Sequence, residues 1–209
     1  MAYSDFTSLS KVRQAFSLKA NSDVEMFAEV AEAEISEFLK MTLERLSPLG
    51  EAIGTEKARS EFIIAPILAE ARSMTRNRVS LFSGIEFNID PDRGLKGVCD
   101  FIFSRSALMY EMTAPAMMVV EAKKEDIVGG IGQCASEMVA ARIFNEREGN
   151  EISAIYGAVT SGSDWKFLKL EDDTIFIDKP QYYLAQVGKI LGILVQILQD
   201  DQAVQAKAA

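Results

Sequence analysis

The sequence of 209 residues contains no histidine. This absence excludes Ser-His-Asp and Cys-His catalysis, and it also excludes zinc sites and nuclease sites that depend on an imidazole. A hydrolase of this composition must rely on carboxylates, lysine, serine, tyrosine or cysteine. Carboxylates acting with a hard divalent metal ion are the most direct route, because Mg²⁺ prefers oxygen ligands.

Cysteine is also scarce. Only Cys99 and Cys134 are present, and their separation does not match the ligand spacing of a metal site. Two cysteines are too few for a disulfide framework, and both lie in apolar stretches. We therefore expect buried thiols in a protein of a reducing compartment.

Long apolar runs are lacking as well. The first twenty residues contain no continuous apolar segment of the kind found in a secretory signal. The most apolar late run, residues 184–198, is interrupted by Gln186, Lys189 and Gln196, and it is too short to span a bilayer. These features predict a cytoplasmic protein with no membrane partner.

Positive charge is in deficit, with 22 Lys and Arg residues against 31 Asp and Glu residues and a net charge of −9. This balance argues against a free-standing, high-affinity nucleic-acid binder, because phosphate contacts depend on Lys and Arg. It remains compatible with an enzyme whose metal ion neutralises phosphate charge locally.

What is present is an ordinary globular composition, long enough for one domain with a sizeable core. Periodicity and turn residues predict helices and strands in an order typical of a single α/β domain with a mixed sheet. Thr55 is expected to cap the second helix, and Pro66 to kink or divide it. The expected helices are 23–46, 54–72, 131–148 and 181–200, and the expected strands are 80–90, 96–104, 116–123, 152–160, 164–170 and 174–178.

Charged residues interrupt two of the apolar strands. Asp100 lies within "VCDFIF", and Glu121 and Lys123 end "MMVVEAK". Because side chains alternate along a strand, Glu121 and Lys123 share a face, and Asp100 can meet them if the two strands are neighbours. Two close carboxylates repel unless a proton or cation lies between them. The set predicts a Mg²⁺ or Mn²⁺ site at which water attacks a phosphodiester, with Lys123 orienting or deprotonating that water.

These residues resemble a known family. Gly-x-x-Asp at 97–100, followed by Glu-Ala-Lys at 121–123, is similar to the PD-(D/E)xK phosphodiesterase superfamily, which is also called restriction-endonuclease-like. Cys99 stands where the family name has Pro, at a position that varies. The segment "GGIGQCASEMVAARIFN" resembles the helix that carries a glutamine soon after Glu-x-Lys, and that glutamine is Gln133 here.

The resemblance extends to the segment "TEKARSEFIIAPIL", which is similar to the helix that precedes the core in nuclease domains of type I restriction subunits. The spacing of that helix implies that Glu56, placed before Arg59 and Pro66, contributes to the site. The family set would then be Asp100, Glu121 and Glu56 as metal ligands, with Lys123 and Gln133 as further catalytic residues.

The resemblance also implies an architecture. One nuclease-like domain would fill residues 1–209, with an N-terminal helical extension at 1–50, an αβββαβ core at 51–170, and the end of a hairpin and a helix at 171–209. DNA would be the substrate of a Mg²⁺-dependent endonuclease. A homodimer, or separate partner subunits for target recognition, would be compatible with this interpretation.

Plain structural explanations remain open for each residue. Glu121 and Lys123 could form the solvated end of a strand, and Asp100 could cap a turn. Glu56 would be favoured by the helix dipole in any first turn, and Gln133 could be a polar helix-face residue. The alternative function is a catalytically silent nuclease-fold protein that acts as an interaction or regulatory module. The acidic balance favours this alternative, and the free-energy cost of burying unused charges opposes it.

Overall fold

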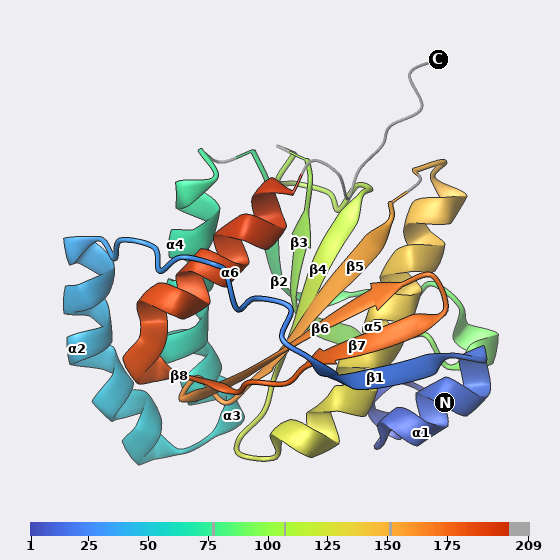
Figure 1. The fold of residues 1–209 in the computed structure, drawn as a ribbon, viewed down its shortest axis with the longest axis horizontal. Coiled ribbons are helices and arrows are strands. Elements are labelled where there is room, and N and C mark those ends of the chain that lie inside the picture. The colour runs from blue at the N-terminus through green and yellow to red at the C-terminus, as the bar shows by residue number, and fades with distance from the viewer. Residues whose placement is uncertain (77, 107, 151, 201–209) are drawn as a thin grey trace.

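The computed structural model of the protein describes residues 1–76, 78–106, 108–150 and 152–200 (Figure 1). The α/β class is confirmed: a mixed central sheet has helices on both faces. The strand order is β1-β7-β6-β5-β4-β3-β2, with β8 paired to β6. The pairs β4–β5 and β1–β7 are parallel, and the other pairs are antiparallel.

The elements have the following bounds. The helices are α1 (Leu9–Phe16), α2 (Glu37–Ile53), α3 (Glu56–Arg59), α4 (Ala65–Met74), α5 (Ile127–Arg147) and α6 (Val187–Gln199). The strands are β1 (Lys19–Val24), β2 (Ser80–Glu86), β3 (Val98–Ser104), β4 (Ala116–Ala122), β5 (Ala154–Thr160), β6 (Asp164–Glu171), β7 (Thr174–Asp178) and β8 (Tyr182–Tyr183).

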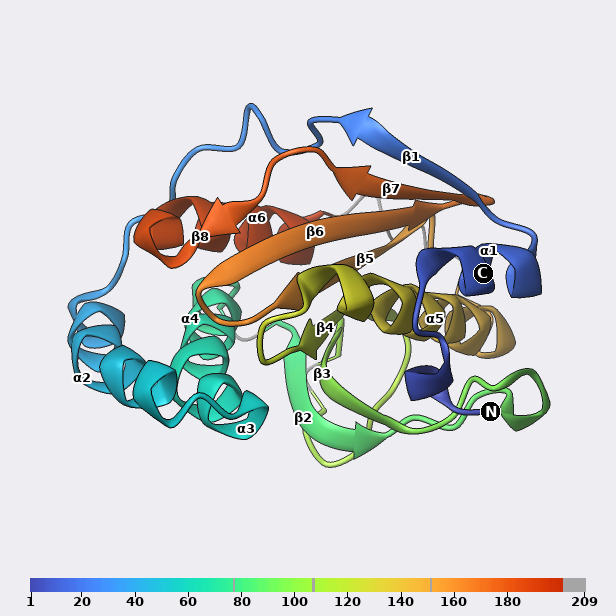
Figure 2. The same cartoon turned by 90° about the horizontal axis from the view of Figure 1, so that it is seen from below.

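The sheet lies between helices on both faces (Figure 2), and an apolar layer fills the space on each face. One layer packs the helices α4 and α6 against the sheet and includes Trp165 and Leu191. The other packs α5 against the opposite face and includes Val119 and Met138. The inner strands β4 and β5 are buried along their whole length, as expected of parallel neighbours covered on both faces.

The expected order of helix, three strands, helix and strand is confirmed from α4 to β5. Thr55 caps α3 as expected, since its Oγ1 accepts a hydrogen bond from the N–H of Ala58 at 3.1 Å. Pro66 divides the second helix as expected. A π-helical stretch at Ser60–Ile64 precedes it, because a proline cannot donate the regular helical hydrogen bond and its ring crowds the preceding turn.

The helix expected at 23–46 is wrong over its first half. Residues 19–24 form β1, which pairs with β7. The next helix, α2, begins only at Glu37. Residues 25–36 instead cross α6, where the N–H of Ala33 donates to the carbonyl of Gly188 at 2.9 Å. A Cβ at Gly192 would lie 2.1 Å from the carbonyl oxygen of Ala31. This tertiary packing overrides the local helix propensity of the segment.

The expected end of the first helix at residue 46 is also wrong, because α2 continues through Pro48 to Ile53. Gly50 packs closely on Ile63, and a Cβ on this glycine would lie only 3.2 Å from that side chain. The helix ends at Gly54, whose φ of 67° is the left-handed cap conformation that glycine adopts at little cost. Residues 1–50 therefore supply a strand and a crossing segment as well as helices.

The topology brings the ends of several strands together at one end of the sheet. β4 and β5 are parallel and finish there, and β3 begins there because it runs antiparallel to β4. Helix α5 also begins at this end, shown at the bottom of Figure 1. Within the described ranges, no helix is long and apolar enough to cross a membrane.

Candidate active site

Glu121 and Lys123 meet at the end of β4. The Glu121 side chain is only 1% exposed, whereas that of Lys123 is 21% exposed. The Lys123 ammonium forms a close ion pair with Oε1 of Glu121 and donates to Oε1 of Gln133 at 3.2 Å. The N–H of Lys123 also donates to the carbonyl of Thr160 at 2.8 Å, which fixes the lysine backbone against β5.

Asp100 lies beside this pair on the neighbouring strand. Its Oδ2 accepts a hydrogen bond from the N–H of Ala122 at 2.7 Å. Phe101 pairs with Val120 across the two strands, so the next step of the register brings Asp100 opposite Glu121. The turn-cap explanation of Asp100 is wrong, because its bond crosses to β4 rather than to a local turn.

Glu56 is the first residue of α3 and is exposed. Its charge contributes to the raised pKa values of Asp100 and Lys123, so Glu56 lies near the end of the sheet where these residues meet. Arg59 ties the helix to the turn after β5, since its Nη1 donates to the carbonyl of Ser161 at 3.1 Å. Glu61 lies five residues after Glu56 and pairs with Lys57 at 2.7 Å.

Glu137 is a site residue that the sequence analysis missed. It lies one helical turn after Gln133 on α5 and is fully buried. The Nε2 of Gln133 donates to Oε1 of Glu137 at 3.2 Å, and the buried carboxyl groups of Glu137 and Glu121 lie near enough for each to affect the pKa of the other. The only signal in the sequence is the Gln-x-x-x-Glu spacing, which puts both side chains on one helix face.

The pKa values of these carboxyl groups are raised. Burial raises the pKa of Glu137 well above its usual range, and the nearby charge of Glu121 adds to this effect. Burial also raises the pKa of Glu121, and the Asp100 carboxylate raises it further. We infer that Glu137 is the member of this pair that keeps its proton, because the Lys123 ammonium stabilises the negative charge of Glu121 and no ion pair among the described residues does so for Glu137.

The two groups closer to solvent respond differently. Burial raises the pKa of Asp100, while its bond from the Ala122 N–H partly opposes this shift. Burial by itself would lower the pKa of Lys123, but the adjacent Glu121 carboxylate outweighs it, so the net shift is upward. Lys123 is therefore a cation in this arrangement.

The site fits a divalent metal ion with few protein ligands. The buried Oε2 of Glu121 accepts no hydrogen bond from the described residues, and Asp100 uses only Oδ2 in its bond to β4. No group of three or more His, Cys, Asp or Glu side chains in the described ranges is arranged to hold a metal ion. Mg²⁺ commonly takes one or two carboxylates together with water and substrate oxygens, which is the donor set that Asp100 and Glu121 offer.

A close approach of helix and sheet holds Lys123 in place. A Cβ at Gly130 would lie 2.6 Å from Cγ1 of Val159 and 2.9 Å from Cγ of Lys123. Only glycine therefore lets the first turn of α5 rest on the lysine stem. This contact brings Gln133 within reach of the Lys123 ammonium.

No protein-family model matches the chain, and no solved structure matches it. The chain is similar to "Crinkler effector protein 1" of Rhizophagus irregularis, with 24% identity over 160 residues. The match covers 74% of this chain and 30% of that protein, so the chain spans less than a third of its relative's length.

Glu137→Gln is expected to stabilise the metal-free protein at pH 8 by at least about 1 kcal/mol, with a difference that shrinks toward pH 4. The folded protein keeps a proton on Glu137 that the unfolded chain releases above the usual glutamate range. Stability is therefore lost as pH rises, and glutamine removes this loss while retaining the bond to Gln133. Urea unfolding in EDTA across this pH range measures the effect.

Glu146→Gln is the matched control, because Glu146 lies on the same helix but is 65% exposed. Its effect should not change with pH in this way. A Glu137→Gln protein that is less stable than the parent at pH 8 would show that Glu137 is ionised in the folded state.

Proposed function

We propose that this protein is a Mg²⁺-dependent nuclease of the PD-(D/E)xK, restriction-endonuclease-like kind that hydrolyses DNA phosphodiester bonds. One observation carries the proposal. Lys123 is held between Glu121 and Gln133, beside Asp100, at the end of a buried strand. This arrangement combines two candidate metal ligands with one cation at a place that solvent can reach.

Each residue has a chemical task in this proposal. Asp100 and Glu121 would hold Mg²⁺ or Mn²⁺, and Glu56 would add a carboxylate from the facing helix. The bound ion would lower the pKa of water and offset the negative charge of the phosphodiester. Lys123 would hold the attacking water or a phosphate oxygen in line, and Gln133 would keep the lysine in position.

The cost of the arrangement supports a functional role. An ion pair with a fully buried carboxylate carries a large desolvation penalty, so such pairs are weak contributors to stability. A second buried carboxyl group at Glu137 adds to that cost. Apolar residues at these strand ends would avoid the desolvation penalty. A need to bind a cation explains why charged residues are present there.

The acidic balance of the chain bears on how DNA would be held. A net charge of −9 gives the protein little general attraction to a polyanion. We therefore propose that target binding involves a second copy of the chain or a partner subunit. The last helix does not offer an apolar dimer face, because its large side chains, among them Ile190 and Leu194, are buried in the core.

The second candidate is a catalytically silent interaction or regulatory module on the same fold. The acidic balance favours it, and the relative's printed name describes an effector and no catalytic activity. In that case the Glu121–Lys123 pair would be a structural ion pair. The two candidates differ in whether loss of the lysine affects a reaction or only the stability of the fold.

Lys123→Ala is expected to abolish Mg²⁺-dependent nicking or cutting of DNA, by at least about a hundredfold, since it removes a cation used at the reacting centre. Purified protein, Mg²⁺ or Mn²⁺ and plasmid or linear DNA are sufficient for the assay, and EDTA should stop the reaction. Lys124→Ala is the matched control, because Lys124 is adjacent and exposed. Equal cutting by Lys123→Ala and the parent would remove this lysine from the reaction.

Glu56→Gln is expected to reduce turnover or to shift the Mg²⁺ concentration needed, well beyond any loss of folded protein. Glu61→Gln should behave like the parent, because Glu61 pairs with Lys57 on the exposed helix face. Activity measured against Mg²⁺ concentration, with thermal melts as the control, separates the two. If both variants have the activity of the parent, Glu56 serves only the helix dipole, an effect of about 0.3–1 kcal/mol on stability.

A further inference from the structure

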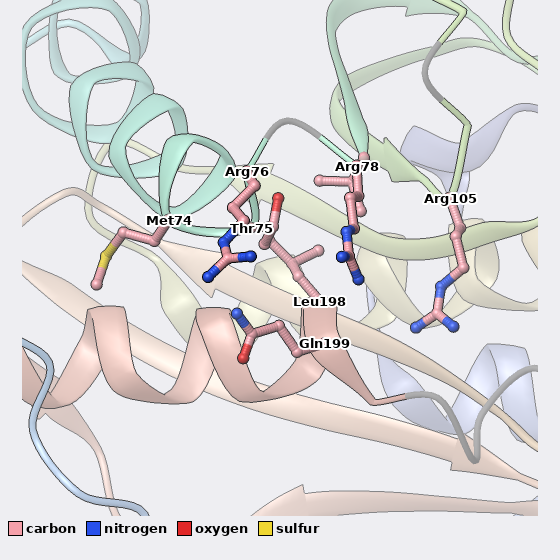
Figure 3. A pocket seen from close by; sticks show the side chains of 8 residues that line it. Met74, Thr75, Arg76, Arg78, Arg105, Leu198 and Gln199 are labelled. Carbon is pink, nitrogen blue, oxygen red and sulfur yellow. The ribbon is translucent and has the colours of Figure 1, made fainter.

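A hollow of about 400 Å³ lies at the opposite end of the sheet from Asp100 and Glu121 (Figure 3). It is formed where α4 and α6 end, β2 begins and β3 ends. Strands of seven residues separate it from the candidate active site, which corresponds to about 20 Å. The residues that line it are Met74, Thr75, Arg76, Arg78, Val79, Arg105, Leu198 and Gln199.

Three arginines converge on this hollow, Arg76 and Arg78 from the segment before β2 and Arg105 from the end of β3, and none of the described residues that line it is acidic. Arg76 and Arg78 are exposed. Within the described part of the chain, their guanidinium groups form no ion pair and donate no hydrogen bond. Such a concentration of positive charge is unexpected in a chain with a net charge of −9.

Helix ends explain only part of this charge. The C-terminal ends of α4 and α6 both lie here, and such ends attract cations. Arg72 lies in the last turn of α4, and its Nε donates to the carbonyl of Val79 at 3.0 Å. Arg105 donates to the carbonyl of Asp200 at 2.7 Å, just beyond α6. Arg76 and Arg78 make no comparable contact with the described residues, so a structural role does not account for them.

The backbone at Arg76 is also unusual. Its φ of 55° lies in the left-handed region, where the end of a helix favours glycine or asparagine. An arginine there carries a conformational cost that glycine would avoid. With arginine at this position, a guanidinium group lies at the rim of the hollow, beside that of Arg78 (Figure 3).

We propose that this hollow binds a small polyphosphate anion, of the chemical class of nucleoside di- and triphosphates. A guanidinium group can donate two parallel hydrogen bonds to the oxygens of one phosphate group. A bound anion would also reduce the electrostatic repulsion among the three arginines. The volume is that of a small-molecule site. Met74, Val79 and Leu198 offer an apolar wall, and Gln199 an amide. The inference goes beyond the proposed nuclease function and does not depend on it.

Calorimetric titration of the full chain with tripolyphosphate tests the proposal, in EDTA so that no metal ion can carry phosphate to Asp100 and Glu121. We expect one binding site per chain, weakened by added salt. Arg78→Gln and Arg76→Gly should each reduce the affinity roughly tenfold or more, because each removes a charge-assisted bond. Arg45→Gln is the matched control, since Arg45 is exposed on α2, away from the hollow.

Arg76→Gly adds a readout that a structural role would not give. Removing the left-handed arginine should leave the melting temperature unchanged or higher, while binding is lost. A nucleoside triphosphate should bind with the same dependence on Arg76 and Arg78, and Lys123→Ala should bind like the parent. The proposal is overturned if neither tripolyphosphate nor the nucleotide binds, if both arginine variants bind like the parent, or if only an oligonucleotide binds.

Discussion

The ion pair between Glu121 and Lys123 is the interaction on which the candidate site depends. It sits at the end of β4, where the chain leaves the buried sheet. Burial of Glu121 would be unfavourable without a positive partner, and Lys123 in turn is held by Gln133 of α5. The pair therefore links the central sheet, the helix that follows it and the neighbouring strand that carries Asp100.

The arrangement of glycines makes this link possible. Gly130 lets the start of α5 lie against Lys123 and Val159, and Gly132 lets the same helix approach the backbone of Phe6 and Ser8. The N-terminal segment thus packs behind the helix that carries Gln133 and Glu137. A shift of this helix would separate Gln133 from Lys123, so packing far from solvent determines the geometry of the partly buried ammonium group.

Much of the site could be predicted from the sequence because it follows from strand alternation. Glu121 and Lys123 interrupt an apolar strand two residues apart, which places them on one face, and Asp100 interrupts the adjacent strand. The cap at Thr55 and the divided helix at Pro66 also follow from local chemistry, and both are confirmed. Local signals of this kind do not depend on the rest of the fold.

Other features depend on contacts that a single sequence does not reveal. Residues 25–36 have helix-forming residues, yet packing on Gly188 and Gly192 holds them in an irregular crossing of α6. In the sequence alone, Glu137 resembles a solvent-facing acid on a helix, whereas in the fold it is buried next to Glu121. Arg76 and Arg78 are far apart in sequence from Arg105 and from α6, and only the fold brings them to one hollow.

The central claim is that Asp100 and Glu121 bind one divalent metal ion, and a titration with Mn²⁺ followed by electron paramagnetic resonance tests it most directly. We predict one site in the parent protein, with an affinity at least about tenfold lower in both Asp100→Asn and Glu121→Gln. Glu125→Gln, which changes an exposed neighbour, should bind Mn²⁺ like the parent. Unchanged Mn²⁺ affinity in the Asp100 and Glu121 variants would contradict the claim.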